Sequence, residues 1–247
     1  MNDKDPRGRD NLYSNPLQQV PEFTFDSTVA EVFPDMINRS VPGYSSVIAV
    51  TGFLARQFSV ENTLIYDLGC SLGASSLAIC QSAAPGCEVI AVDNSRAMID
   101  RLSKRLEPMP NTAVAVRPML ADIASMEFKP ASMIVMNYTL QFIAVSQRVA
   151  LLTRLAEALI PGGILVLSEK IKLPEPQLDK LFNDLHHDFK RSNGYSELEI
   201  SQKRDAIENV LIPESLDEHR TRLSNAGFDR IETWFQCFNF ASMVAFK

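Results

Sequence analysis

The sequence predicts an α/β fold, a doubly wound and mostly parallel sheet that ends in an antiparallel hairpin and carries extra helices. Three observations support this prediction. Short apolar runs alternate with helical stretches, which is typical of βαβ units and a parallel sheet. The first of these runs, 63–67, ends in an acid and is followed by glycines. Two β-rich runs near the C-terminus have a short connection, which predicts an antiparallel pair.

The expected elements follow from this alternation of patterns. We expect strands over 63–67, 87–93, 112–116, 131–137, 164–167, 231–235 and 240–246. We expect helices over 26–40, 44–58, 75–83, 95–106, 147–159, 182–191, 197–211 and 216–226. A Val-Pro-Gly turn at Val41–Gly43 separates the first two helices.

The chain has 247 residues, 46% of them hydrophobic, so one large domain can bury a sufficient core without a disulfide or a metal. We expect a mobile polar arm over 1–22 and one ligand-binding domain over 23–247, with a helical insertion at about 175–212. The four cysteines (Cys70, Cys80, Cys87 and Cys237) lack metal-type C-x-x-C spacing, which favours reduced thiols and no metal site.

The net charge of −6 opposes a large direct contact with nucleic acid, because an acidic protein repels a phosphate backbone at long range. No apolar segment typical of a secretory signal begins the chain, and no apolar run approaches the roughly 18 residues that a membrane span needs. We therefore expect a cytoplasmic protein without a membrane partner.

A candidate ligand site lies at Tyr66–Gly73, where a strand ends and a helix begins. Glycine permits close approach of a ligand, and ligands of open α/β sheets bind beyond the carboxyl ends of the strands. Asp93 ends the next strand, 20 residues after the last glycine, which suits hydrogen bonds from ribose hydroxyls. Asp93 can instead cap the helix beginning near Ser95. Asp122 follows the third strand, where it can face an adenine edge.

Three ligand classes compete for this turn. A dinucleotide site would need a third glycine, and Ser71 stands at the position of the second. A nucleophile elbow also matches Gly69–Gly73, but it needs a histidine on a loop. His186, His187 and His219 all fall in predicted helices, where we expect them to be structural. The D-x-G-x-x-x-G loop of S-adenosylmethionine enzymes is complete here, and we favour it.

Two further positions bear on the chemistry. Asn137 follows the fourth strand without the prolines that grip an amine acceptor, so we interpret it as a cofactor contact. Arg204 falls on the apolar stripe of its predicted helix, where a buried guanidinium needs a partner. The apolar members of that stripe are Ile200, Ile207 and Leu211. The partner is either an acid, Glu199 or Glu208, or a ligand carboxylate that matches the guanidinium fork.

The preceding helix has its own apolar stripe, for which packing is the expected role. Its members are Leu178, Leu181, Phe182, Leu185 and Phe189. His186 and His187 are expected at the edge of this stripe without a catalytic role.

Several long motifs together resemble one family closely. They are Phe25–Ser45, Tyr66–Gly73, His186–Arg191, Asn193–Arg204 and Trp234–Phe240. The family is carboxy-S-adenosyl-L-methionine synthase, and the resemblance runs from about residue 25 to the C-terminus. It implies a sheet of the class I methyltransferase type.

The resemblance implies that S-adenosylmethionine and prephenate are converted to carboxy-S-adenosylmethionine and phenylpyruvate. Prephenate would lose CO2 and its ring hydroxyl as the ring becomes aromatic, and the methyl carbon beside the sulfonium would capture the CO2. A separate enzyme would use the product to carboxymethylate a tRNA wobble uridine. A homodimer is also implied. A conventional small-molecule methyltransferase and a non-enzymatic cofactor-binding protein remain as alternatives.

The family's ligand contacts fall on positions spread along the chain. They are Tyr44, Gly69, Cys70, Ser71, Asp93, Asn94, Asp122, Ile123, Asn137 and Arg204. Arg204 would take part in the reaction by holding the added carboxylate, and Tyr44 would cover the cofactor. The expected bound ligand is S-adenosylmethionine or its carboxylated form, with no metal. The sequence leaves open the general base, the prephenate contacts, and whether Arg204 serves its own site or a neighbour's.

Overall fold

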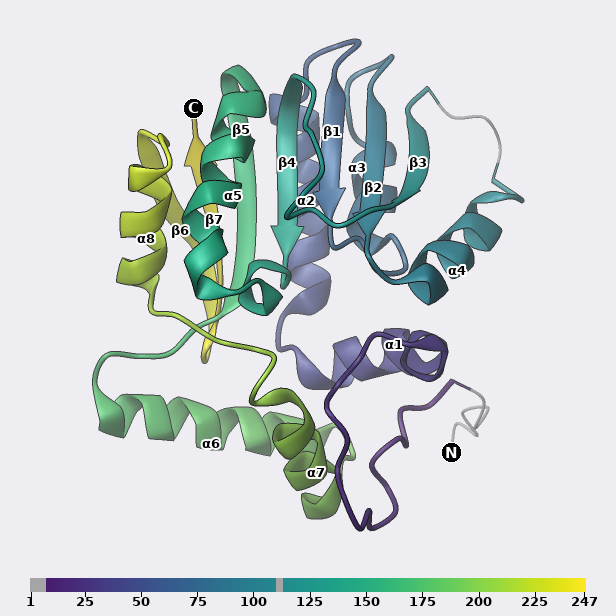
Figure 1. Ribbon diagram of the computed structural model, residues 1–247, viewed down its shortest axis with the longest axis vertical. Helices are drawn as coiled ribbons and strands as arrows, with labels where there is room; N and C mark the ends of the chain where they lie inside the picture. Colours follow the sequence, from purple (N-terminus) through teal and green to yellow (C-terminus); the bar gives the residue numbers. More distant parts are fainter. Residues whose placement is uncertain (1–7, 110–112) are drawn as a thin grey trace.

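The computed structural model describes residues 8–109 and 113–247, in which seven strands form one sheet of order β3-β2-β1-β4-β5-β7-β6 (Figure 1). The strands are β1 Leu64–Leu68, β2 Glu88–Asp93, β3 Ala115–Leu120, β4 Ala131–Asn137, β5 Leu159–Lys170, β6 Arg230–Cys237 and β7 Phe240–Phe246. The first five strands pair in parallel, and β7 pairs antiparallel with both β5 and β6. The predicted fold class is confirmed.

Eight α-helices and one short 3-10 helix accompany the sheet within the described residues. They are α1 Ser27–Ser40, α2 Tyr44–Phe58, α3 Ala74–Cys80, α4 Arg96–Leu106, η1 Leu140–Phe142, α5 Val145–Ala158, α6 Pro176–Ser192, α7 Glu197–Ile207 and α8 Leu216–Asn225. Side-chain caps set several starts: the Asp26 carboxylate accepts the Val29 amide of α1, and Ser196 and Ser215 open capping boxes. No helix among the described residues is long and apolar enough to cross a membrane.

The two faces of the sheet bury alternate residues of each strand, because side chains of a strand point to opposite faces. One face packs on α5 and α8 through Tyr66, Ile90, Ile134, Leu165, Leu152 and Leu223. The other packs on α2 and α3 through Ile65, Val89, Met133, Val166, Ala55 and Ile79. Burial of each Val, Leu, Ile or Met side chain among them contributes about 1.5–3 kcal/mol, so these layers fix the strands between the helices.

Three helices lie across the carboxyl ends of the parallel strands (Figure 1). They are α1, α6 and α7, which we call the helical cap. The α6 and α7 helices fall within the insertion expected at about 175–212. Because ligands of such sheets bind at this edge, the helical cap covers the expected site.

The N-terminal segment from residue 8 onward is packed against the helical cap. Asp10 and Tyr13 are buried, and the Tyr195 hydroxyl donates a hydrogen bond to the Asp10 carboxylate. The Gln202 amide of α7 bonds the backbone at Tyr13 and Leu17, at 2.9 and 2.7 Å. The predicted mobile arm over 1–22 is therefore wrong from residue 8 onward, and its first seven residues lie outside the described part. The described part of this segment forms hydrogen bonds with the helical cap and with the residues beside it, and sequence patterns do not reveal such distant contacts.

Several predicted boundaries also differ: β5 begins at Leu159 and not at 164, α6 begins at Pro176 and not at 182, and β3 and α7 differ as well. The third strand runs over Ala115–Leu120 and not 112–116, of which residue 112 lies outside the described residues. This strand carries Pro118, which an edge strand tolerates. The α7 helix ends at Ile207 and not at 211, shortly before Pro213 disfavours helical backbone at the residue preceding it.

Candidate functional site

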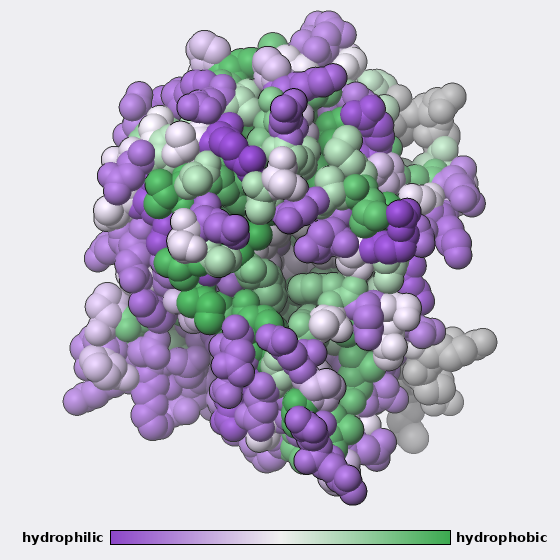
Figure 2. All heavy atoms as spheres, in the orientation of Figure 1, coloured by the Kyte–Doolittle hydropathy of each residue, from purple (hydrophilic) through white to green (hydrophobic). Residues whose placement is uncertain are grey.

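A cavity of about 360 Å³ lies between the strand ends and the helical cap. Figure 2 shows hydrophobic side chains around the hollow at this place. Its lining includes nearly every predicted ligand contact: Tyr44, Gly69, Cys70, Ser71, Asp93, Asn94, Asp122, Ile123 and Asn137. The fold thus brings these residues together from α2 and from the ends of four strands. The volume is within the roughly 300–1,000 Å³ typical of small-molecule sites.

The glycine turn after β1 presents its backbone to this cavity. Gly69 has φ of 76°, and a Cβ on it would lie 2.2 Å from the Thr139 hydroxyl oxygen. The Gly69 and Cys70 amides both donate to the Val92 carbonyl, at 2.8 and 2.9 Å, which fixes the turn against β2. Only glycine fits at position 69, since a side chain meets both backbone strain and a collision. Burial raises the pKa of the Cys70 thiol, so this wall residue stays protonated.

Asp93, at the end of β2, is fixed by backbone amides. Its Oδ2 accepts the Ser71 amide at 2.9 Å and its Oδ1 accepts the Ser95 amide at 2.8 Å. Ser95, and not Asp93, is the N-cap of α4, where its hydroxyl accepts the Met98 amide at 3.2 Å. Burial raises the pKa of Asp93, while these amide bonds oppose the rise. Each oxygen keeps a further lone pair, so the carboxylate can accept the two hydroxyls of a ribose.

Asp67 supports the turn from inside the sheet. It is fully enclosed, and the Ser76 hydroxyl donates to it at 2.5 Å. Burial raises the pKa of Asp67 to about 6. Asp122 also lines the cavity; it is exposed and accepts the Ala124 amide at 2.8 Å, and the next residue, Ile123, is buried.

Asn137 and Tyr44 both line the cavity. The Asn137 amide group donates to Ser75 at 3.0 Å and accepts from Ser168 at 2.6 Å, so its orientation is fixed. Tyr44 begins α2, and its ring centroid lies 6.3 Å from that of Tyr138. The preceding Gly43 has φ of 74°, and a Cβ there would lie 2.2 Å from the ring of Phe235 on β6.

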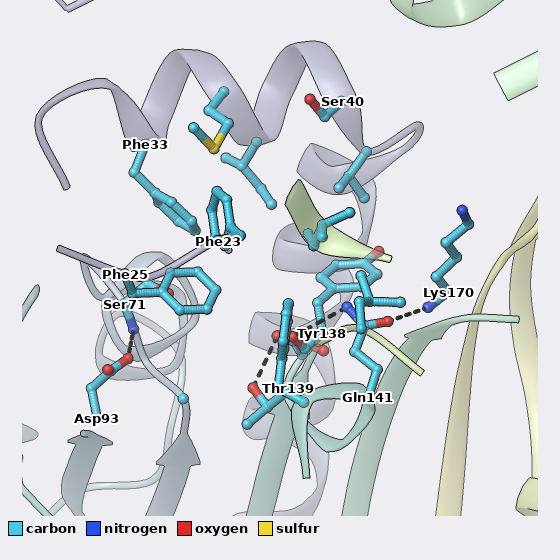
Figure 3. A pocket seen from close by; sticks show the side chains of 18 of the residues that line it. Phe23, Phe25, Phe33, Ser40, Ser71, Asp93, Tyr138, Thr139, Gln141 and Lys170 are labelled. Carbon is cyan, nitrogen blue, oxygen red and sulfur yellow. Dashed lines mark hydrogen bonds between the residues drawn. The ribbon is translucent and has the colours of Figure 1, made fainter. Parts of the chain in front are cut away.

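Glu169 holds the segment after β4 over the cavity. Its two oxygens accept the amides of Leu140 and Gln141 at 2.9 and 2.8 Å. Burial raises the pKa of Glu169 to about 8. The Gln141 side chain in turn accepts the Lys170 amide at 2.9 Å (Figure 3). The Glu169 carboxyl group thereby positions η1, a role that the sequence pattern did not indicate.

Arg204 does not line the cavity. Its side chain is 57% exposed and pairs with Asp205 at 3.1 Å. The prediction that it lies buried on an apolar stripe is wrong, because α7 buries the face around Lys203 and the next residue turns about 100° away. Glu199 is bound in the capping box of α7, and Glu208 makes no ion pair with Arg204, so the alternative of a salt bridge to Glu199 or Glu208 is wrong as well.

Comparison with known proteins identifies the family. A family model described as a methyltransferase domain matches residues 65–163, which hold the glycine turn and Asp93. A carboxy-S-adenosyl-L-methionine synthase of Pseudomonas syringae pv. syringae is 52% identical over 240 residues, 96% of this chain and 97% of that protein. The chain belongs to the carboxy-S-adenosyl-L-methionine synthase family. The synthase of Photobacterium profundum is 52% identical over 241 residues, 97% of this chain and 98% of that one.

Solved structures outside the carboxy-S-adenosyl-L-methionine synthase family share the fold. Human N-acetylserotonin methyltransferase, in complex with S-adenosylmethionine, matches with a TM-score of 0.60 at 16% identity, over 90% of this chain and 55% of that one. Magnesium protoporphyrin IX methyltransferase of Synechocystis has a TM-score of 0.59 at 17% identity, over 86% of this chain and 87% of that one. These likenesses support a methyltransferase fold.

Basic residues that the sequence analysis did not single out line the cavity of this family member. They are Lys170 of β5, Lys190 of α6 and Lys203 of α7, with His186 of α6 beside them. His186 is buried in the cavity wall, where only a packing role at a stripe edge was expected. The available signal was the spacing of His186 and Lys190, four residues apart and so on one helix face.

Other side chains have no site of their own. Leu178 and Leu181 of α6 are exposed, so the prediction that this whole stripe packs is wrong. None of the four cysteines, all of which lie in the described part of the chain, forms a disulfide. Among the described residues, no group of three or more His, Cys, Asp and Glu side chains could hold a metal ion.

Proposed function

We propose that this protein is a carboxy-S-adenosyl-L-methionine synthase, which converts S-adenosylmethionine and prephenate to carboxy-S-adenosylmethionine and phenylpyruvate. The observation that carries the proposal is a single cavity with two chemically different ends. One end has the glycine turn and Asp93, and the other has lysines among aromatic side chains. A nucleoside suits the first end, and an anionic acid suits the second. Family membership over nearly the whole chain supports the same activity.

Each predicted contact has a role in holding S-adenosylmethionine. The Asp93 carboxylate would accept the ribose hydroxyls, and Asp122 with the amide of Ile123 would face the adenine. The backbone of the glycine turn and the Asn137 side chain would contact the methionyl part, and Tyr44 would cover the sulfonium. The fixed orientations of Asp93 and Asn137 support these roles, because a preorganised site loses little entropy on binding.

The reaction needs orientation and exclusion of water more than it needs acid–base groups. Prephenate releases CO2 and hydroxide as its ring becomes aromatic, the sulfonium methyl loses a proton, and the carbon binds CO2. The proton and the hydroxide leave as water, so the atoms balance. Aromatic side chains close the cavity: the rings of Phe25 and Phe142 lie 5.3 Å apart, and those of Tyr138 and Phe240 lie 6.2 Å apart. Such walls retain CO2 and exclude solvent.

We also propose a homodimer in which Arg204 reaches the cavity of the second chain and holds the added carboxylate. Exposure of Arg204 outside its own cavity supports the neighbour's site over its own. Leu178 and Leu181 of α6 and Leu198 of α7 are exposed on the helices next to it, and apolar side chains of this kind supply an interface. Burial in that interface would give Arg204 the dry surroundings in which a guanidinium–carboxylate pair is strongest.

The product would serve a separate enzyme that carboxymethylates a tRNA wobble uridine in the cytoplasm. The acidic chain supports a role without tRNA contact, because its net charge of −6 repels the phosphate backbone. Tight, salt-sensitive binding of tRNA to the isolated protein would contradict this division of labour.

Mass spectrometry tests the activity directly. The protein is incubated with S-adenosylmethionine and with prephenate labelled with ¹³C in its ring carboxylate. We expect S-adenosylmethionine to gain one labelled carboxylate and phenylpyruvate to form in equal amount. Formation of S-adenosylhomocysteine with a methylated acceptor would instead show a conventional methyltransferase. Binding without any turnover would show a cofactor-binding protein.

A further inference from the structure

The ammonium groups of Lys170 and Lys190 have no direct partner in the described part of the chain. No hydrogen bond or ion pair joins either ammonium group to any residue of 8–109 or 113–247, although both lysines line the cavity. Lys203 differs, because its Nζ lies 3.5 Å from the Asp10 carboxylate and 3.2 Å from the Ser40 hydroxyl. Two of the three lysines are thus unpaired.

Unpaired ammonium groups are expensive to bury, and here they also repel each other. Burial lowers the pKa of Lys190 to about 7, and the charges of Lys203 and Lys170 act in the same direction. Burial likewise lowers the pKa of Lys170. The charges of Asp10 and Asp179 oppose these two shifts without cancelling them. A bound anion would offset the remaining cost.

The His186 ring adds no charge to this end of the cavity. Its Nε2–H donates to the Ser40 carbonyl at 2.7 Å, so Nδ1 carries a lone pair. Nδ1 is buried and has no hydrogen-bond partner among the described residues. Burial lowers the pKa of His186 far below its usual value, so the ring is neutral and can accept a hydrogen bond from a ligand hydroxyl.

We propose that Lys170 and Lys190 form a subsite that binds a carboxylate of the second substrate, at the end of the cavity opposite Asp93. Figure 3 shows Asp93 at one end of the cavity and Lys170 at the other, with Tyr138 and Gln141 between them. The ligand class is a carboxylic acid with an apolar body, since aromatic side chains form the walls between the two ends. This inference rests on the proposed function and names the residues that receive its acid.

The α-carboxylate of S-adenosylmethionine has the same chemistry, so the experiment must separate two sources of the anion. Lys170→Met and Lys190→Met remove the charge and keep most of the side-chain length. Lys172→Met and Lys180→Met are matched controls, because these exposed lysines pair with Glu218 and Asp184 outside the cavity. For each variant we measure the dissociation constant of S-adenosylmethionine, the KM for prephenate at saturating S-adenosylmethionine, and the melting temperature.

We expect each cavity variant to raise the prephenate KM at least tenfold, because a hydrogen bond to a charged group is lost. The dissociation constant of S-adenosylmethionine should stay within about twofold. The melting temperature should stay or rise, since removing an unpaired buried charge relieves the free protein. The control variants should match the wild type in all three measurements.

Different results overturn the inference. Weaker S-adenosylmethionine binding with an unchanged prephenate KM assigns the lysines to the cofactor's carboxylate. A lower melting temperature, with the dissociation constant of S-adenosylmethionine and the prephenate KM altered equally, would give Lys170 and Lys190 a structural role only. If the wild type makes no carboxylated product, the proposed function fails, and the subsite is tested by the shift in melting temperature that phenylpyruvate causes in S-adenosylmethionine-saturated protein. A shift that both Met variants lose supports the subsite, and an equal shift in all variants contradicts it.

Discussion

The carboxylate of Asp93 accepts the backbone amide of Ser71 at 2.9 Å, which ties the end of β2 to the glycine turn that follows β1. The two residues are 22 positions apart, yet they set the geometry of one ligand site. Substitutions at Asp93 should therefore act both on the proposed ribose contact and on the turn.

Asp93→Ala should weaken S-adenosylmethionine binding by about tenfold to a hundredfold, because hydrogen bonds to a charged group contribute about 1.5–3 kcal/mol. Isothermal titration calorimetry measures this effect. Asp100→Ala, on the exposed side of α4, is the control and should bind normally. Unchanged affinity in Asp93→Ala would remove the ribose role.

Gly69→Ala should abolish measurable S-adenosylmethionine binding, because the added Cβ collides with Thr139 and displaces the turn. Gly162→Ala separates collision from backbone strain. Gly162 has φ of 79° and nothing within 4 Å of a Cβ, so this variant carries only the strain. Both variants should lose about 1 kcal/mol or more of stability, and only Gly69→Ala should lose the ligand. Equal ligand binding by the two variants would contradict this account.

Glu214→Gln should destabilise the fold by about 3–5 kcal/mol, because it leaves the buried guanidinium of Arg148 and that of Arg222 without their shared carboxylate. Urea unfolding measures the loss, and the exposed Asp217→Asn should change stability little.

Burial opposes ionisation of Glu214, but the hydrogen bonds from both arginines outweigh it and lower its pKa. Its stabilisation is therefore present above pH of about 4.3 and is lost as the pH falls through the lowered pKa. The gap between wild type and Glu214→Gln should narrow in acid.

The prephenate KM should rise as the pH increases from about 6 to 8.5, because burial lowers the pKa of Lys190 to about 7 and the proposed subsite holds a carboxylate only while this lysine is protonated. The charged groups that act on Lys190 are Lys170 of β5, Lys203 of α7 and Asp10 of the N-terminal segment. Neutral His186 lies one turn earlier on α6. Lys190→Arg should flatten the profile, since a guanidinium stays charged over this range. A profile of the same slope in Lys190→Arg would assign the titration to another group.

Arg204→Ala should weaken binding of carboxy-S-adenosylmethionine by at least tenfold and leave S-adenosylmethionine binding nearly unchanged. Only the carboxylated ligand supplies a partner for the guanidinium. Arg204→Lys should recover part of the loss, because an ammonium lacks the bidentate fork. Competition calorimetry with both ligands checks the difference, and Arg220→Ala serves as an exposed control. Equal weakening of both ligands would make Arg204 structural.

The sequence predicted those parts of the site that local patterns encode. Gly69 and Asp93 stand at strand ends, and a strand end is visible as an apolar run that stops at glycine or acid. The fold class follows from the same runs and is confirmed. The helical cap was harder to interpret, because its helices bury polar side chains. In α7 the apolar stripe through Ile200 suggested Arg204, whereas the buried face carries Lys203.

Lys203 was missed because its partners are distant in sequence. Asp10 lies 193 residues before it, and Ser40 lies 163 residues before it. The periodicity of α7 gives no sign of such distant partners, so in the sequence the buried Lys203 cannot be distinguished from an exposed lysine. The same reason explains the packed N-terminal segment, whose burial depends on Tyr195 and Gln202.

The contact between Gly43 and Phe235 has a consequence for how this protein can evolve. The ring of Phe235 occupies the space that a Cβ on Gly43 would need. The residue after Gly43 is Tyr44, which begins α2 and lines the cavity. A larger side chain at either position would shift that helix start, so the two positions are expected to change together or not at all. An alignment of relatives should show glycine at 43 wherever an aromatic residue stands at 235. The C-terminal hairpin thus restricts which substitutions are tolerated beside the cavity, although Phe240 is the one described hairpin residue that lines it.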